Sequence, residues 1–284
     1  EEALRGLPKM ARQKRADLAA SLMGNDPVHV AKREPLANRR CDARFEELGT
    51  IVLLYGETLR ALRHKPRLRH ILAQMSHLGV DSLMIVSLTL LFTGVVISLQ
   101  TADVLIRFGA QGTLGGIVTI AIGRELGPVL VAVVCAGRVG SAITAEIATM
   151  KVTEQIDALR VMAVSPVDYL LVPRMLACMI VVPILTVFGD VIGVFGGWLI
   201  AVFYKGLTTY SYMNSIHIFA DLFDMTGGVI KAIFFGNVIA VLGCYYGLHC
   251  PDGAEGVGRA TTKTVVASII VIFLLNAVLT FLLY

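Results

Sequence analysis

Charged residues are scarce over most of this sequence, and the scarcity is uneven. Only 16% of the 284 residues are charged, whereas 56% are hydrophobic. Residues 1–77 hold 15 of the 25 lysines and arginines, and the other 207 residues carry 22 charges in total. Soluble domains have about 25% charged residues, and too few polar side chains remain here to cover the apolar ones. This excludes an ordinary soluble enzyme and a disordered binding protein, and it indicates an integral membrane protein.

Motifs for nucleotide, metal and nucleophile chemistry are also missing. The sequence contains no GxxxxGK[ST] phosphate loop and no HExxH, CxxC or GxSxG motif, and its six histidines are scattered. The chain therefore has no phosphate loop with which to bind ATP. We expect no catalytic residues, no metal site, no cofactor of its own and no nucleic-acid partner. Its five cysteines form no close pairs and are expected to be small buried residues.

Long apolar segments fill the chain beyond its basic N-terminal part. An α-helix needs about 20 residues to cross the hydrocarbon layer of a bilayer. The sequence predicts an all-α integral membrane protein with an interfacial amphipathic helix and about five transmembrane helices. The third of these is long for one crossing. The spans are expected near residues 80–105, 112–136, 171–203, 225–248 and 263–283.

The basic N-terminal part divides into two regions. Residues 1–44 are polar and basic, and we interpret them as a cytoplasmic N-terminal extension. Residues 45–63 carry apolar side chains at alternating steps of three and four, which predicts a helix lying in the headgroup layer. A helix packed on a soluble partner is the alternative. The positive-inside rule then places this part and the loops 138–170 and 249–262 in the cytoplasm.

Charged side chains inside the apolar segments are candidate functional residues. Arg124 and Glu125 lie near the middle of the second predicted span, where charge is costly. They either line a polar cavity where a headgroup passes or anchor one helix to another, and Pro128 is expected to disturb the helix turn before it. Lys231 either has such a role or extends to the interface. Asp190 is expected to be buried, and either protonated or paired with a cation.

Two further patterns concern packing and connection. Gly189, Gly193 and Gly197 repeat a GxxxG spacing that lets transmembrane helices approach closely. The segment 144–162 predicts one helix between two spans, with opposite charges three residues apart. That helix is either a solvated connector or a docking surface for a soluble partner. Its predicted charge pairs are Lys151 with Glu154 and Asp157 with Arg160.

A series of motifs follows in order along the chain: Arg124-Glu125-Leu126-Gly127-Pro128, Ala136-Gly137-Arg138, Gly140-Ser141-Ala142, Thr144-Ala145-Glu146-Ile147, Met150, Thr153-Glu154-Gln155, Pro166, Pro173-Arg174 and Gly256-Val257-Gly258-Arg259-Ala260-Thr261-Thr262-Lys263. This series resembles the MlaE/YrbE permease family, the membrane subunits of ABC transporters that work with MCE-domain proteins. The resemblance covers residues 45–284, which it identifies as an MlaE-type permease domain. It implies a homodimer with a separate MlaF-like ATPase, which binds ATP and Mg, on the cytoplasmic face. It also implies an MCE-domain partner on the other side, and a STAS-domain protein often joins.

The resemblance also implies a substrate and site residues. The substrate is phospholipid or a related lipid, moved between the membrane and the MCE-domain partner. The host membrane is the bacterial inner membrane, with the plastid envelope as the alternative. Asp190 departs from the family pattern and receives no role. The lipid-cavity residues are Arg124, Glu125, Lys231 and Arg259, and those of the coupling helix 144–162 are Glu146, Met150, Lys151, Glu154 and Asp157.

Two other functions remain open from the residues themselves. An ion-coupled secondary carrier or channel would transport in an ion gradient without any ATPase. A structural membrane scaffold would tolerate replacement of Arg124 and Glu125 as long as its complex still formed.

Overall fold

The computed structural model of this protein describes residues 49–58, 60 and 68–284. The proposed extension 1–44 lies outside the described residues. Of the helix expected over 45–63, the structure describes a helical segment at 49–58, in which Val52 and Leu53 are exposed. The remaining residues of that prediction, apart from residue 60, lie outside the described part.

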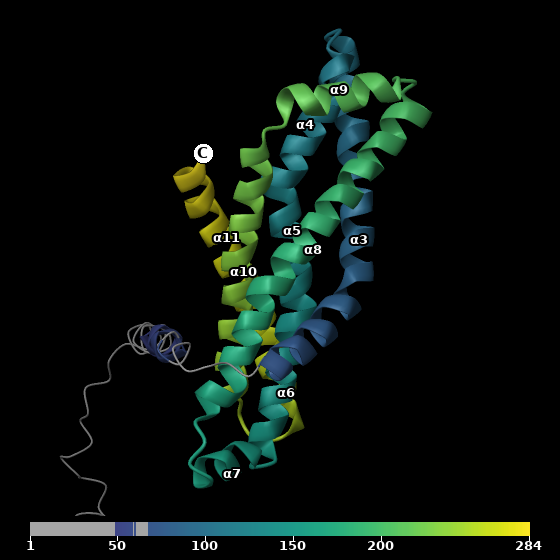
Figure 1. The fold of residues 1–284 in the computed structure, drawn as a ribbon. Helices are drawn as coiled ribbons and strands as arrows, with labels where there is room; N and C mark the ends of the chain where they lie inside the picture. Colours follow the sequence, from purple (N-terminus) through teal and green to yellow (C-terminus); the bar gives the residue numbers. More distant parts are fainter. Residues whose placement is uncertain (1–48, 59, 61–67) are drawn as a thin grey trace, which may run out of the picture. The chain divides into compact units, whose positions relative to one another are not determined.

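From residue 68 onward the chain forms a bundle of long helices that run up and down (Figure 1). The described residues contain no strand, and five of their helices are long and apolar enough to cross a membrane. The predicted all-α fold with five spans is therefore confirmed. The first span is α3 (Leu68–Arg107). The second is a continuous helix made of η3 (Gln111–Thr113), α4 (Leu114–Ala121), η4 (Ile122–Leu126), α5 (Gly127–Cys135), η5 (Ala136–Gly140) and α6 (Ser141–Val152). The third is made of η6 (Val167–Leu171), α8 (Val172–Leu199) and η7 (Ile200–Tyr204), and the fourth and fifth are α10 (Leu222–Leu248) and α11 (Ala254–Leu283).

The second span is longer than predicted because its polar continuation also packs inside the bundle. The Thr144 hydroxyl lies 3.1 Å from the carbonyl oxygen of Gly243 and 2.7 Å from the hydroxyl of Thr264, so α6 is held between α10 and α11. The prediction of one separate helix over 144–162 is wrong. The span continues to the end of α6, the backbone turns left-handed at Glu154 with φ 59°, and the short helix α7 (Gln155–Val161) follows.

Helix α9 (Thr209–Phe219) has no counterpart among the predicted elements. It runs across the end of the bundle opposite α7 (Figure 1). The Thr208 side chain accepts a hydrogen bond from the Ser211 N–H and caps its first turn. Tyr212, in the same helix, is buried, and its hydroxyl donates to the Val194 carbonyl at 3.2 Å. Burial raises the pKa of that hydroxyl. The two ends are called the α7 end and the α9 end below.

Glycines bring α3 and α8 into close backbone contact. A Cβ added at Gly94 would collide with the carbonyl oxygen of Gly193, and one added at Gly196 would lie 2.5 Å from that of Leu91. The Ser98 hydroxyl donates to the Gly197 carbonyl at 2.9 Å across the same interface. The packing role predicted from the GxxxG spacing is therefore confirmed, and it acts within one chain.

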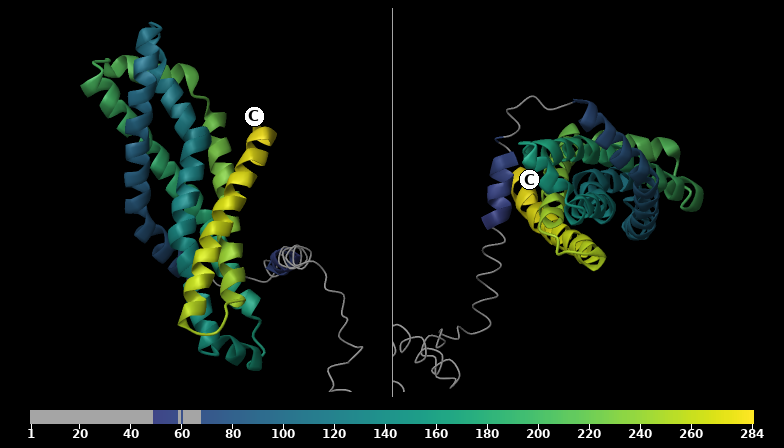
Figure 2. Two further views of the ribbon diagram at one scale, coloured as in Figure 1. Left: turned by 180° about the vertical axis from the view of Figure 1, so that it is seen from behind. Right: turned by 90° about the horizontal axis from the view of Figure 1, so that it is seen from below.

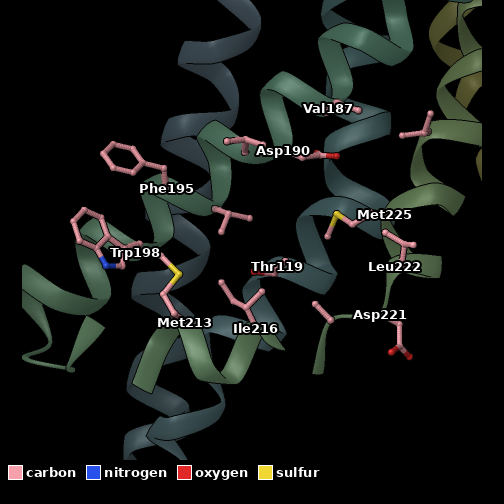
Figure 3. Close-up of a pocket in the computed structure, with 14 residues that line it drawn as sticks. Thr119, Val187, Asp190, Phe195, Trp198, Met213, Ile216, Asp221, Leu222 and Met225 are labelled. Atoms are coloured by element: carbon pink, nitrogen blue, oxygen red, sulfur yellow. The ribbon is translucent and has the colours of Figure 1, made fainter. Parts of the chain in front are cut away.

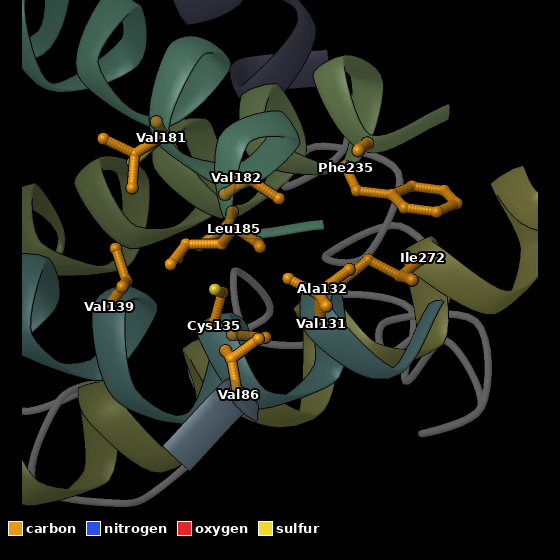
Figure 4. Close-up of a cluster of buried hydrophobic side chains, with 14 of the residues drawn as sticks. Val86, Val131, Ala132, Cys135, Val139, Val181, Val182, Leu185, Phe235 and Ile272 are labelled. Carbon is orange, nitrogen blue, oxygen red and sulfur yellow. The ribbon is translucent and has the colours of Figure 1, made fainter. Parts of the chain in front are cut away.

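The buried core is shared by all five spans. Valine, leucine and alanine side chains from α3, α5 and α8 meet Phe235 of α10 and Ile272 of α11 (Figure 4). Cys135, Cys178, Cys244 and Cys250 are unpaired and buried, as expected of small core residues. Figure 2 shows α11 packed against α10 along one side of the bundle, which brings its polar residues near the second span.

Candidate functional site

A π-helical turn presents Arg124 and Glu125 inside the second span. Both residues lie in η4, a segment with i to i+5 hydrogen bonding, and Pro128 follows at the start of α5. Proline has no backbone N–H, so the Arg124 carbonyl loses the donor that an α-helix would supply four residues later. The Lys231 ammonium donates to that carbonyl at 3.1 Å instead. The expected disturbance before Pro128 is confirmed, and a side chain from α10 compensates for it.

Glu125 is the centre of a polar cluster that joins three helices. Its carboxylate oxygen Oε1 accepts a hydrogen bond from Lys231 Nζ at 2.7 Å and one from the Thr280 hydroxyl at 2.9 Å. Oε2 accepts from the Asn276 amide at 3.1 Å. Lys231 Nζ also lies 2.8 Å from Thr280 Oγ1. We call Glu125, Lys231, Asn276 and Thr280 the Glu125 cluster.

Lys231 is wholly inside this cluster. Its side chain has 0% exposure, compared with 32% for that of Glu125. The alternative that Lys231 extends to the membrane interface is therefore wrong. A fully buried ammonium is costly unless it is paired and hydrogen-bonded, and here one carboxylate and two further oxygens surround it.

Arg124 points to different partners, as expected for adjacent residues on a helix. Its guanidinium carbon lies 3.3 Å from the centre of the Tyr284 ring, a cation–π contact. Its Nε lies 4.0 Å from Asp224 Oδ1, which is at the limit of an ion pair. The Arg124 side chain is 34% exposed, so its edge remains accessible while Lys231 is enclosed.

The sequence interpretation missed four residues around this site. Asn276, Thr280 and Tyr284 follow one another at intervals of four along α11, which places them on one helix face. Asp224 lies in the first turn of α10. The signal that could have found the first three is a polar stripe in an otherwise apolar span. Asp224 carried no such signal, because it stands near a span end where charge is common.

Arg259 does not belong to this site. It lies in the first turns of α11 and pairs with Glu255 at 2.6 Å, and both side chains are mostly exposed. About 30 Å of helix, at 1.5 Å per residue, separates it from Thr280. The structure therefore brings together Arg124, Glu125 and Lys231 and leaves Arg259 at the α7 end.

The residues assigned to coupling lie at the α7 end in two different settings. In α6, Glu146 forms an ion pair with the buried Arg174 at 2.8 Å, and Met150 packs partly buried beside them. The Lys151 ammonium donates to the Cys250 carbonyl at 2.8 Å, which ties α6 to the loop before α11. These three residues therefore hold α6 in place as well as reaching the surface.

The other two residues for which the resemblance implies a coupling role are exposed. Glu154 occupies the left-handed turn between α6 and α7, and Asp157 pairs with Arg160 at 3.0 Å. The predicted Asp157–Arg160 pair is confirmed. Lys151 and Glu154 form no ion pair, because the helix ends between them and Lys151 turns to Cys250. The turn and α7 thus present two carboxylates at this end of the bundle.

Asp190 is buried, as expected, but apart from the Glu125 cluster. It is 6% exposed, and no cation pairs with it among the described residues. A Cβ added at Gly127 would collide with its carboxylate, so the Asp190 side chain lies directly against the Gly127 backbone. Its side chain faces a cavity (Figure 3).

The part of the chain that the structure describes offers no candidate metal site. The described residues contain no group of three or more His, Cys, Asp or Glu side chains that could hold a metal ion. The Glu125 cluster and Arg124 are instead suited to binding charge within an apolar environment. Counting Asp224, the two cations and the two carboxylates have a formal net charge of zero.

Comparison with known proteins gives one family and several relatives. The model of a family described as Permease MlaE matches residues 71–282. The chain is 43% identical over 214 residues to a probable ABC transporter permease protein of Rickettsia typhi, covering 75% of this chain and 83% of that one. It is 40% identical over 245 residues to the intermembrane phospholipid transport system permease protein MlaE of Haemophilus influenzae, covering 83% and 91%. It is 36% identical over 231 residues to the chloroplastic protein TRIGALACTOSYLDIACYLGLYCEROL 1 of Arabidopsis thaliana, covering 81% and 66%.

Proposed function

The chain belongs to the MlaE permease family, and from this premise we propose that it moves phospholipid as the membrane subunit of an ABC transporter. It is a multi-pass membrane permease and not an enzyme. The observation that carries the proposal is the accessible Arg124 beside Glu125, whose carboxylate is paired with the enclosed Lys231. The substrate is inferred from the Haemophilus influenzae relative, which is an intermembrane phospholipid transport system permease protein.

The chemistry of a phospholipid suits this arrangement. Its tails need apolar surroundings, and its phosphate needs a cation within them. Tyr284 covers one face of the Arg124 guanidinium, which leaves the in-plane N–H donors free for an oxyanion. The long contact to Asp224 is weaker than the bidentate hydrogen bonds that a phosphate would form. Lys231 neutralises Glu125, so that carboxylate repels an approaching phosphate less.

The partners of the proposed transporter are inferred from the same family membership. We infer a second copy of the chain, an MlaF-like ATPase that supplies ATP and Mg chemistry, an MCE-domain protein and a STAS-domain protein. The ATPase would dock at the α7 end and the MCE-domain protein at the α9 end. In this proposal residues 45–284 are the permease domain, with residues 45–63 at the headgroup layer and 1–44 as a cytoplasmic extension. The proposed host is the bacterial inner membrane, and the chloroplastic relative keeps the plastid envelope as the alternative.

Replacement of Arg124 by alanine tests the proposed substrate contact. Hydrogen bonds to a charged group contribute about 1.5–3 kcal/mol, so lipid transfer is expected to fall roughly ten- to hundredfold. The Glu125–Lys231 pair stays intact, so insertion and complex yield should not change. The measurement is ATP-dependent transfer of a fluorescent phospholipid by the reconstituted complex, with complex yield recorded for each variant.

Two variants sharpen this test. Arg124→Lys keeps the charge but loses the planar donor pair, so it should recover only part of the transfer rate. Arg107→Ala removes an exposed arginine at the end of α3 and should leave transfer unchanged. Normal transfer with Arg124→Ala would support a scaffold. Transfer in an ion gradient without the ATPase would support a secondary carrier.

Charge reversal at the α7 end tests the proposed ATPase contact. Glu154→Lys combined with Asp157→Lys replaces two exposed carboxylates with cations. Like charges placed across an interface cost several kcal/mol, so ATPase affinity should fall by at least about tenfold. Asp221→Lys, at the α9 end, is the matched control. Unchanged co-purification of the ATPase with the double variant would show that α7 is only a connector.

A further inference from the structure

A cavity of about 710 Å³ lies among α4, α8, α9 and the first turns of α10 (Figure 3). This volume falls within the range of small-molecule sites in proteins. Most of its wall is apolar, with Phe195, Met213, Ile216 and Met225 among the contributing side chains. No residue of the Glu125 cluster lines it, so it is separate from the site described above.

Three polar groups on the cavity wall have no hydrogen-bond partner among the described residues. They are the Asp190 oxygen Oδ1, the Thr119 hydroxyl and the Trp198 ring N–H. Asp190 is 6% exposed and Thr119 is 5% exposed. A buried polar group without a partner costs about 1–3 kcal/mol, so these groups are suited to a ligand that supplies the missing partners.

The charge of the wall restricts the ligand. The described residues that line the cavity include the acids Asp190 and Asp221 and no lysine, arginine or histidine. A phosphate would meet a buried acid with no cation to compensate for it. A hydroxyl suits the wall better, because it donates one hydrogen bond and accepts two. It would donate to the Asp190 carboxylate and accept from a neighbouring donor such as Thr119.

The mouth of the cavity indicates the route of entry. Val187 is 48% exposed, Val191 65% and Phe195 50%, and all three border the cavity on a helix long and apolar enough to span the membrane. These side chains face what would be the hydrocarbon layer around the bundle. A ligand with apolar chains would therefore enter sideways from the bilayer.

We propose that this cavity binds an uncharged lipid through its hydroxyl group, with Asp190 and Thr119 as the hydrogen-bonding residues and the apolar wall around its chains. The site lies beside the transport machinery: Asp190 abuts Gly127 at the end of η4, and Met225 abuts Gly123 within it. The proposal does not depend on the proposed phospholipid transport, because it concerns binding in a different cavity.

The sequence provides a direct reporter of occupancy. Trp198 is the chain's single tryptophan, and it lines this cavity. The permease is placed in phosphatidylcholine nanodiscs and titrated with diacylglycerol that carries a doxyl quencher on one acyl chain. Phosphatidylcholine labelled on the same chain is the matched probe, because it differs only in its head. We expect saturable quenching by the diacylglycerol with an apparent affinity at least about tenfold above that of the phosphatidylcholine.

Variants then test the named contacts. Asp190→Leu and Thr119→Val should each lower the diacylglycerol affinity by about tenfold, whereas Asp190→Asn, which keeps an acceptor oxygen, should stay within about twofold. Asp221→Asn changes an exposed acid at the rim and should have no effect. Thr119→Val keeps the shape of the side chain, so it decides the matter if Asp190→Leu folds poorly.

Three results would contradict the proposed binding of an uncharged lipid in this cavity. Equal quenching by both probes would mean that any acyl chain enters, which overturns recognition of a hydroxyl. Absence of saturable quenching would leave the cavity to water or to a partner's helix and would also overturn the proposal. Unchanged affinity in Thr119→Val and in folded Asp190→Leu would remove the assigned residues.

Discussion

Replacement of Glu125 by leucine is expected to destabilise the permease by about 3–5 kcal/mol, because it leaves the Lys231 ammonium as an unpaired buried charge. That ammonium has 0% exposure, and only the Arg124 carbonyl and the Thr280 hydroxyl would remain within hydrogen-bond distance. Neither is a counter-ion. The measurement is the thermal unfolding midpoint and the folded yield of the detergent-purified protein.

The reverse change is expected to cost less. In Lys231→Met the Glu125 carboxylate keeps the Asn276 and Thr280 donors and is 32% exposed, so water can reach it. The double variant Glu125→Leu with Lys231→Met removes both charges and should recover most of the stability lost in Glu125→Leu. Equal losses for the two single variants, or a double variant no better than Glu125→Leu, would contradict a buried pair that acts as a unit.

Valine at Gly94 is expected to separate α3 from α8. A Cβ at this position would collide with the backbone carbonyl of Gly193, which cannot rotate aside as a side chain could. Overpacking costs typically about 1–3 kcal/mol. The contact between α3 and α8 is the most extensive one among the described helices, so a backbone collision there should reach the upper end of that range or exceed it. The Ser98 hydrogen bond to Gly197 should be lost with it. The thermal midpoint and the yield of monodisperse protein report the effect.

A matched glycine controls for the change of residue type. Gly258 lies in α11 with open space where a Cβ would stand. Gly258→Ala should therefore keep or slightly raise stability, since alanine has the higher helix propensity. A thermal midpoint for Gly94→Val that equals the wild-type value would show that α3 and α8 can move apart without cost.

The spans were predictable because the bilayer imposes a length that the sequence must satisfy. Charge in the middle of a span is rare enough that Arg124 and Glu125 stood out before any contact was known. The residues that pair with them did not stand out in the sequence. Lys231 stands 106 residues from Glu125, and nothing local distinguishes a lysine that reaches inward from one that reaches the interface.

The predictions failed where polar residues are buried inside the bundle or where a short helix depends on one hydrogen bond. Residues such as Thr144 read as the start of a connecting segment, yet tertiary hydrogen bonds to α10 and α11 hold the helix inside the bundle. Helix α9 was missed because its 11 residues are too few to cross a membrane and its start depends on a single threonine cap. In both cases a contact between distant parts of the chain, or one hydrogen bond, decides what a local pattern leaves open.

The π-helical turn at η4 makes the orientation of this site depend on residue number as well as residue type. A π turn holds one residue more than the α-helical turn it replaces, and one residue corresponds to about 100° of rotation. Deleting a single residue within residues 122–126 would restore regular winding and swing the helix on one side of the deletion by that angle relative to the other. Residues before and after the deletion, such as Gly123 beside Met225 and Gly127 beside Asp190, would then no longer both face their present partners. Positions in related permeases therefore correspond only where the winding through this turn is the same.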